Sequence, residues 1–455
     1  MRKRKKKNSS KFILPSIIVF FTIILFLSLP FLLKFKSIQN IIEKKVSSEF
    51  KINLKNLDDI SFKIFPRPHY LVKKANLDLN IKDDKSSIIE TNNLKIFIST
   101  KNIYSKKNIN IEGIEIGNAN IYFKIKDILD FRNHLYYKIN KPIYIKNSKF
   151  FLQDIKNKTI LISPIRKMSY FINNKNNSKE LKIKGNIFDV NYHSSWKRFY
   201  DKPKNSLNEI NLKNPNIFIK NFFSFEDKSN FRGKSSINFL NEDFIINYLM
   251  KDNKIIINSP NQIKNQKIKL NSIIELEPFF FDATIDINQK DNIFLIDNLL
   301  NFILNSKEEY LENVNGKLTL VVNNLKNSII NNGNINISIK EKKIKLENSL
   351  FEVNNIGKVR SNFRYYENKG DLIFASENIF EITNKKEFSR KFQLSSKKIK
   401  SINRIYFDLE KNIDNGEISI SNIYLNKVDT EHFSEKYYII KNLHELKVLI
   451  RNFLT

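Results

Sequence analysis

The stretch that decides the fold class is residues 109–125, INIEGIEIGNANIYFKI. Apolar residues stand at every second position in Ile109 and Ile111, and again in Ile114 and Ile116. A period of two predicts a β-strand with one apolar and one polar face. The phase slips by one residue between the two pairs, where Gly113 stands, and this predicts a β-bulge or a tight turn.

The same alternation continues through most of the chain after residue 51. It recurs at 52–54, 62–64, 75–81, 94–98, 335–339, 344–346 and 405–409. Turn residues separate several of these runs: 341–343 and 368–370 join neighbouring strands, and Asn415-Gly416 is a strong hairpin signal. The sequence therefore predicts a mainly β protein, built as an elongated antiparallel sheet.

Three segments have a helical period instead. Residues 34–50 carry apolar side chains at spacings of three and four, which predicts a short amphipathic helix. Residues 291–305 predict a second helix, with Asp291 as its N-cap. Residues 437–453 predict a third, within an amphipathic C-terminal segment at 431–455. The β region between the first and last helix spans residues 51–430.

The N-terminus has the pattern of a membrane anchor. Residues 1–11 contain a basic cluster, and no charged residue occurs from 12 to 33. A run of this length is sufficient to cross a hydrocarbon core of ~30 Å. Because short positive segments stay in the cytoplasm, the N-terminus is expected inside and the bulk of the chain outside. The expected anchor residues are Phe12, Leu14, Ile17, Phe20, Ile24, Leu27, Phe31 and Leu33.

Two other interpretations of the N-terminus remain open. A cleaved signal peptide also begins with basic residues, but its apolar run is usually shorter and ends at a small-residue cleavage site. The basic cluster alone is also typical of nuclear-localisation or nucleic-acid-binding tails. The long apolar run directly behind the cluster favours the uncleaved anchor.

Composition limits the chemistry that the chain can carry. It has 455 residues, a net charge of +31 and no cysteine, which excludes disulfides, zinc–thiolate sites and a cysteine nucleophile. The positive charge indicates attraction to anionic surfaces or, alternatively, the lysine bias of an AT-rich genome. The lysines are scattered and form no basic face with interleaved aromatic residues, so no nucleic acid is expected as a partner.

Signals of an enzyme are nearly absent from the sequence. The five histidines, at positions 69, 134, 193, 432 and 444, form no metal-binding spacing. The sequence contains no nucleophile elbow and no glycine loop for a phosphate. We therefore expect no catalytic residue, no metal and no cofactor. The long apolar strand surface remains, either as a closed core or as an open groove, and periodicity cannot distinguish the two.

One region resembles a known family. The order of a signal-anchor helix, an amphipathic helix, a strand pair ending in Phe65-Pro66-Arg67-Pro68 and a strand containing Ala75-Asn76-Leu77-Asp78-Leu79 is similar to the start of AsmA-family proteins of Gram-negative envelopes. In residue detail the resemblance covers about the first 130 positions. In pattern it extends over most of the chain.

The resemblance implies an inner-membrane anchor with the body of the protein in the periplasm. It implies a role in outer-membrane biogenesis and in the targeting of proteins to that membrane, with phospholipid and an envelope protein as partners. Larger relatives resemble bridge-like lipid transporters with a taco-shaped β-groove. On that basis the expected lipid-groove residues are Leu77, Leu79, Ile96, Ile121, Phe123, Ile125, Ile337 and Ile339. The alternative function is an anchored periplasmic scaffold or assembly factor with a closed β core.

Overall fold

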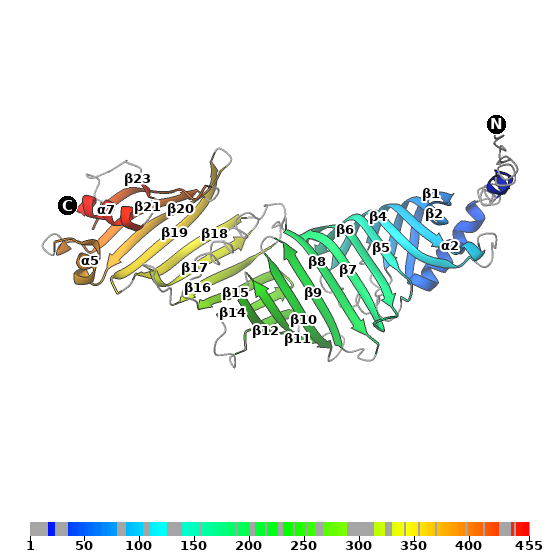
Figure 1. Ribbon diagram of the computed structural model, residues 1–455, viewed down its shortest axis with the longest axis horizontal. Helices are drawn as coiled ribbons and strands as arrows, with labels where there is room; N and C mark the ends of the chain where they lie inside the picture. The colour runs from blue at the N-terminus through cyan, green and yellow to red at the C-terminus, as the bar shows by residue number, and fades with distance from the viewer. Residues whose placement is uncertain are drawn as a thin grey trace, which may run out of the picture. The chain divides into compact units, whose positions relative to one another are not determined.

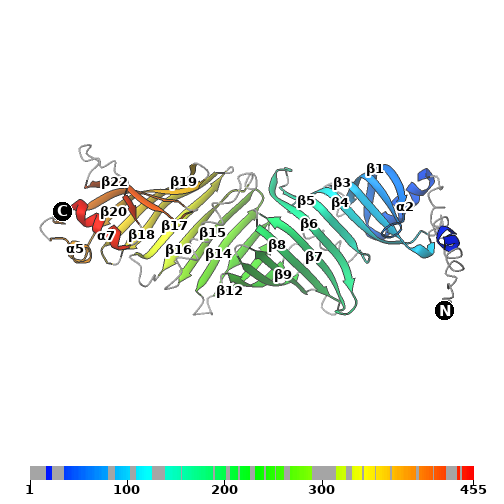
Figure 2. The same cartoon turned by 45° about the horizontal axis from the view of Figure 1, so that its top comes forward.

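The computed structural model describes most of the chain, which is mainly β as the sequence predicts (Figures 1 and 2). The described residues are 17–22, 35–79, 88–102, 109–124, 139–154, 156–187, 190–200, 205–213, 216–225, 231–239, 242–251, 253–260, 267–288, 314–323, 330–340, 343–353, 355–368, 371–395, 399–412, 415–426, 438–440 and 443–454.

The chain divides into two compact units. Unit 1 comprises Met1–Phe151, Ser163–Gly185 and Ser195–Pro203, and unit 2 comprises Leu152–Ile162, Asn186–Ser194 and Lys204–Thr455. Each unit is described separately below.

Unit 1 begins with helix α2 (Phe35–Phe50), which confirms the predicted helix at 34–50. The helix ends at Phe50 because Lys51 adopts a left-handed conformation with a φ of 56°. The next four strands form an antiparallel run in chain order, β1 (Ile52–Lys63), β2 (His69–Leu79), β3 (Ile88–Ile98) and β4 (Ile111–Lys124). The following strands have residues in both units: β5 (Ile143–Gln153), β6 (Thr159–Asn173), β7 (Ser178–Ile187) and β8 (Val190–Phe199), with β6 and β7 antiparallel.

The phase slip in the opening stretch is a β-bulge, as predicted. Ile98 pairs with Ile111 but Phe97 pairs with Gly113, so β4 has one extra residue between these pairs. A side chain at Gly113 would begin 3.0 Å from the carbonyl oxygen of Pro142, so a glycine fits this close approach. The bulge keeps the isoleucines on both sides of it directed to the same face.

Unit 2 contains a longer run of strands. These are β9 (Asn205–Lys213), β10 (Ile217–Phe225), β11 (Phe231–Phe239), β12 (Glu242–Lys251), β13 (Lys254–Asn258), β14 (Ile268–Leu276), β15 (Phe279–Asn288), β16 (Gly316–Asn323), β17 (Ile330–Lys340), β18 (Lys343–Val353), β19 (Gly357–Asn368), β20 (Asp371–Ile382), β21 (Arg404–Asn412), β22 (Ile418–Leu425) and β23 (Tyr438–Ile440). The hairpins predicted at 341–343, 368–370 and Asn415-Gly416 are confirmed.

The prediction of a purely antiparallel sheet is wrong at one step, because β15 and β16 pair in parallel. All other described pairings in unit 2 are antiparallel. A parallel pair needs a crossover connection of a dozen residues or more. The chain between Asn288 and Gly316 is long enough for that crossover. The helix predicted at 291–305 falls in this connection and lies outside the described residues.

The C-terminus differs from the single helix predicted at 437–453. Tyr438–Ile440 forms strand β23 on β22, and only Leu443–Leu454 is helical, as α7. Tyrosine and isoleucine favour strands, and the edge of β22 offers them hydrogen-bonding partners. A short helix that the sequence reasoning missed, α5 (Lys385–Phe392), precedes β21 and buries Phe388 and Phe392.

Two of the eight expected anchor residues lie in the part of the chain that the structure describes. Ile17 and Phe20 lie in a helical segment at residues 17–22, with side chains 45% and 61% exposed. Phe12, Leu14, Ile24, Leu27, Phe31 and Leu33 lie outside the described residues. Within the described part of the chain, no helix combines the length and apolarity needed for a membrane crossing.

Candidate functional site: the apolar sheet face

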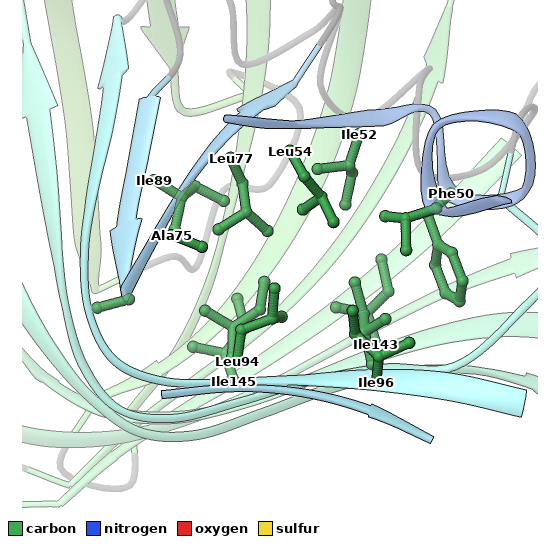
Figure 3. Packing of buried hydrophobic residues seen from close by; sticks show 14 of the residues in the cluster. Phe50, Ile52, Leu54, Ala75, Leu77, Ile89, Leu94, Ile96, Ile143 and Ile145 are labelled. Carbon is green, nitrogen blue, oxygen red and sulfur yellow. The ribbon is translucent and has the colours of Figure 1, made fainter. Parts of the chain in front are cut away.

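In unit 1 the apolar strand face is filled by the protein's own side chains. Figure 3 shows Ile52, Leu54 and Leu77 facing Leu94, Ile96 and the isoleucines of β5. Phe50 of helix α2 lies against the same cluster and has no exposed surface. Side chains packed in this way form a hydrophobic core, because their surface is already removed from water.

Five of the eight expected groove residues belong to this core. Leu77, Leu79, Ile96, Ile121 and Phe123 are all buried, with Leu77 and Ile96 at 0% exposure. Two others lie in unit 2, where Ile337 is buried on β17 and Ile339 is half-buried. Ile125 lies outside the described residues. The structure therefore gathers five expected residues in one packed core and does not bring all eight into one site.

In unit 2 the strand register aligns a single apolar face across neighbouring strands. Ile219 on β10 is opposite Ile237 on β11, and Ile237 is opposite Phe244 on β12. Further along, Leu270 on β14 is opposite Ile285 on β15. Because side chains alternate in direction along each strand, these residues all lie on one side of the sheet, which we call the apolar face.

Burial on the apolar face is incomplete between β10 and β15. Its cluster has six buried members, Ile237, Phe239, Phe244, Ile246, Ile268 and Ile287. Five more residues pack against the cluster but remain half-buried, Ile217, Ile219, Ile257, Leu270 and Ile285. A strip of accessible apolar surface thus follows the sheet in unit 2, unlike the filled interior of unit 1. The sequence reasoning did not select this strip, although the same period-two signal is present there.

A row of polar side chains crosses the apolar face near its middle. Asn221 accepts hydrogen bonds from Ser235 at 3.1 Å and from the hydroxyl of Tyr248 at 2.6 Å. On the neighbouring strands, Ser194 donates to Asn208 at 3.2 Å. Burial raises the pKa of Tyr248 to about 12, against a smaller lowering by its bond to Asn221. The tyrosine is therefore a permanent donor, and the row satisfies its polar groups internally.

Several titratable groups in the described parts of the chain form ion pairs between neighbouring strands. Glu115 on β4 contacts Lys95 at 2.9 Å and Lys146 at 2.6 Å. Burial raises the pKa of Glu115, but the hydrogen bonds from Lys146 and Lys95 outweigh it and hold that pKa below its usual value. No group of three or more histidine, aspartate or glutamate side chains in the described residues is arranged to hold a metal ion.

Comparison with known protein families and with curated proteins finds no match for this chain.

Proposed function

We propose that this chain is a non-enzymatic, membrane-anchored protein whose apolar face in unit 2 holds the hydrocarbon chains of phospholipid. The observation that carries the proposal is the half-buried strip between β10 and β15, which includes Ile219, Ile257 and Ile285. An acyl chain lying on this strip would bury both its own surface and that of the isoleucines, at about 0.8 kcal/mol per buried CH₂ group. Such contacts are non-directional, so a chain can slide along the strands.

The resemblance to the AsmA family supports the same function. In this proposal the segment at 12–33 anchors the protein in the inner membrane, and the strands lie in the periplasm. Movement or holding of phospholipid there would assist outer-membrane biogenesis and the targeting of proteins to that membrane.

The test uses the full-length protein in its own membrane. A photo-crosslinking phenylalanine analogue is placed at Ile219, Ile257 or Ile285, and lipid adducts are identified by mass spectrometry after irradiation. The residue next to Ile219 or Ile285 along its strand, at 218 or 286, points to the opposite face and gives a matched control. We expect phospholipid adducts at the three isoleucine positions and few at the controls. Equal adducts at both sets, or none at either, would refute lipid holding on this face.

A second candidate function is an anchored scaffold or assembly factor with a closed core. The complete burial of the cluster around Leu77 and Ile96 in unit 1 favours it. The same crosslinking experiment separates the two functions, because a scaffold would give protein–protein adducts from exposed positions and no lipid adducts from the apolar face.

A further inference from the structure

The opposite face of the same strands carries a trough that the proposed function does not use. The trough has a volume of about 980 Å³ and is lined by residues of β9 to β13. Its lining contains two rows of directly paired residues. One row is Phe222, Lys234, Asn247 and Asn258. The other row is Ser224, Arg232, Leu249 and Ile256.

The lining residues between the two rows fix the side of the sheet on which the trough lies. Phe223, Gly233 and Tyr248 alternate with the two rows, so their side chains belong to the apolar face and their backbone forms the floor of the trough. Gly233 has a specific role, because a side chain there would collide with the ring of Tyr248 and with the carbonyl oxygen of Phe222. Tyr248 thus packs over the glycine from the apolar side and closes the floor.

One end of the trough is cationic. Arg232 and Lys234 both line it, two residues apart on β11. The ammonium of Lys220, which is directly opposite Glu209 on β9, lies 5.4 Å from the ring centre of Phe222. No carboxylate occurs among the described residues that line the trough. An anionic group is the charge-complementary occupant of this end.

The other end is apolar and exposed to solvent. Leu249 is opposite Ile256, which is opposite Ile273 on β14, so three adjacent strands place aliphatic side chains side by side. These side chains are 36%, 36% and 49% exposed, respectively, and they lie on the same side of the sheet as Arg232 and Lys254. Beyond them, Lys254 and Glu275 neutralise each other in an ion pair at 2.8 Å. From β11 to β14 the row spans three strand spacings, about 14 Å.

We infer that this trough binds a single anionic phospholipid, with its phosphate at Arg232 and Lys234 and one acyl chain along Leu249, Ile256 and Ile273. The cations and the aliphatic row occur in the order that an amphiphile requires. The site is separate from the apolar face, since it lies on the other side of the same strands. A second copy of this chain is a poor occupant, because the net charge of +31 makes like-charged faces repel each other.

The experiment uses the full-length protein in neutral detergent with a trace of phosphatidylglycerol carrying a photoreactive group in its acyl chain. Adducts are mapped to peptides by mass spectrometry. We expect labelling of the peptides that contain Leu249, Ile256 and Ile273. The variant Arg232→Ser/Lys234→Ser is expected to lower this labelling about tenfold or more, given the contribution of each basic residue to binding anionic lipid.

Three controls decide the outcome. The variant Lys358→Ser/Arg364→Ser removes two cations that lie on the charged side of β19, and it is expected to leave the labelling unchanged. A phosphatidylcholine probe is expected to label the trough weakly and to be insensitive to the Arg232/Lys234 variant. Phe222→Ser/Ile256→Ser tests the apolar part with the cations retained, and is expected to reduce labelling.

Adducts spread over the charged side of the sheet, or equal losses in both cation variants, would show general attraction to a basic protein and overturn the inference. Labelling by photoreactive fatty acid but not by phosphatidylglycerol would also overturn it. Loss of the apolar-face adducts at Ile219, Ile257 and Ile285, with the trough adducts kept, would refute the proposed function and leave this site in place.

Discussion

Replacing Leu77 with alanine tests directly whether unit 1 is a packed core. The Leu77 side chain has no exposed surface and belongs to the cluster that includes Phe50 and Ile96. Removing three carbons from such a site leaves a cavity that the neighbours fill only in part. The expected loss in the free energy of unfolding is about 2–5 kcal/mol.

The single tryptophan of the chain provides the assay. Trp196 packs against the same cluster, so its fluorescence reports the unfolding of unit 1. With a urea dependence of about 1–3 kcal/mol per molar, the loss corresponds to a drop in the urea midpoint of about 0.7–5 M. Lys73→Ala, on the same strand with an exposed side chain, is the control and is expected to leave the midpoint in place. Leu77→Met keeps the volume and is expected to recover most of the stability.

A small effect would refute the packed core. If Leu77 lined an open conduit, water or lipid would occupy the space left by the deleted atoms. The midpoint would then move by less than about 0.3 M. Phospholipid recovered with the protein would change instead.

Three further substitutions test individual contacts. Burial lowers the pKa of His69 below its ordinary value of 6.5, so the folded state resists protonation of this side chain. Unit 1 therefore loses stability as the pH falls through that lowered pKa. In His69→Gln the urea midpoint should depend less on pH between pH 7 and pH 5. Asn378→Ala leaves the buried hydroxyl of Ser361 without its acceptor at 2.6 Å and should cost unit 2 about 1–3 kcal/mol by calorimetry. Asn384→Ala removes the cap on the amide of Glu387 and should cost about 1 kcal/mol, seen as faster hydrogen exchange in α5.

Each of these has an outcome that contradicts it. An unchanged pH profile in His69→Gln would show that another group titrates in this range. A wild-type melting curve for Asn378→Ala would mean that water replaces the lost acceptor. Equal exchange rates in α5 would mean that the packing of Phe388 and Phe392 alone holds the helix.

The strands could be predicted from the sequence because each one has a single apolar face. The alternation at 109–125 predicts both the strand and its bulge at Gly113, because a bulge shifts the phase of the alternation by one residue. Other bulges were not predicted. Asn348 has a φ of 34° beside a register shift in β18, and asparagine tolerates such an angle without a glycine to signal it. The N-cap of α5 was visible in principle, as Asn384 followed three residues later by Glu387.

The parallel pairing of β15 with β16 was beyond the sequence for a different reason. Alternation specifies the face of a strand, but not which strand lies beside it or in which direction. The same limit applies to the candidate site. The period of two is alike in 94–98 and in 268–270, yet Ile96 is fully buried and Leu270 is half-buried. The difference depends on what packs over each face, and that is a property of the folded chain.

The positive charge also takes on a different meaning once the residues are placed. A lysine bias of the genome would scatter cations without regard to their surroundings. Several lysines are indeed matched across strands, as in the pairs of Lys55 with Asp78 and of Lys254 with Glu275. Such exposed pairs contribute little to stability. They leave no net charge at their own positions. The trough at Arg232 and Lys234 is lined by cations and no carboxylate among the described residues, and it adjoins the aliphatic row of Leu249. Compositional bias can supply the lysines, but it does not account for a cationic end placed directly beside an exposed apolar row, and that arrangement is what binding of an anionic amphiphile requires.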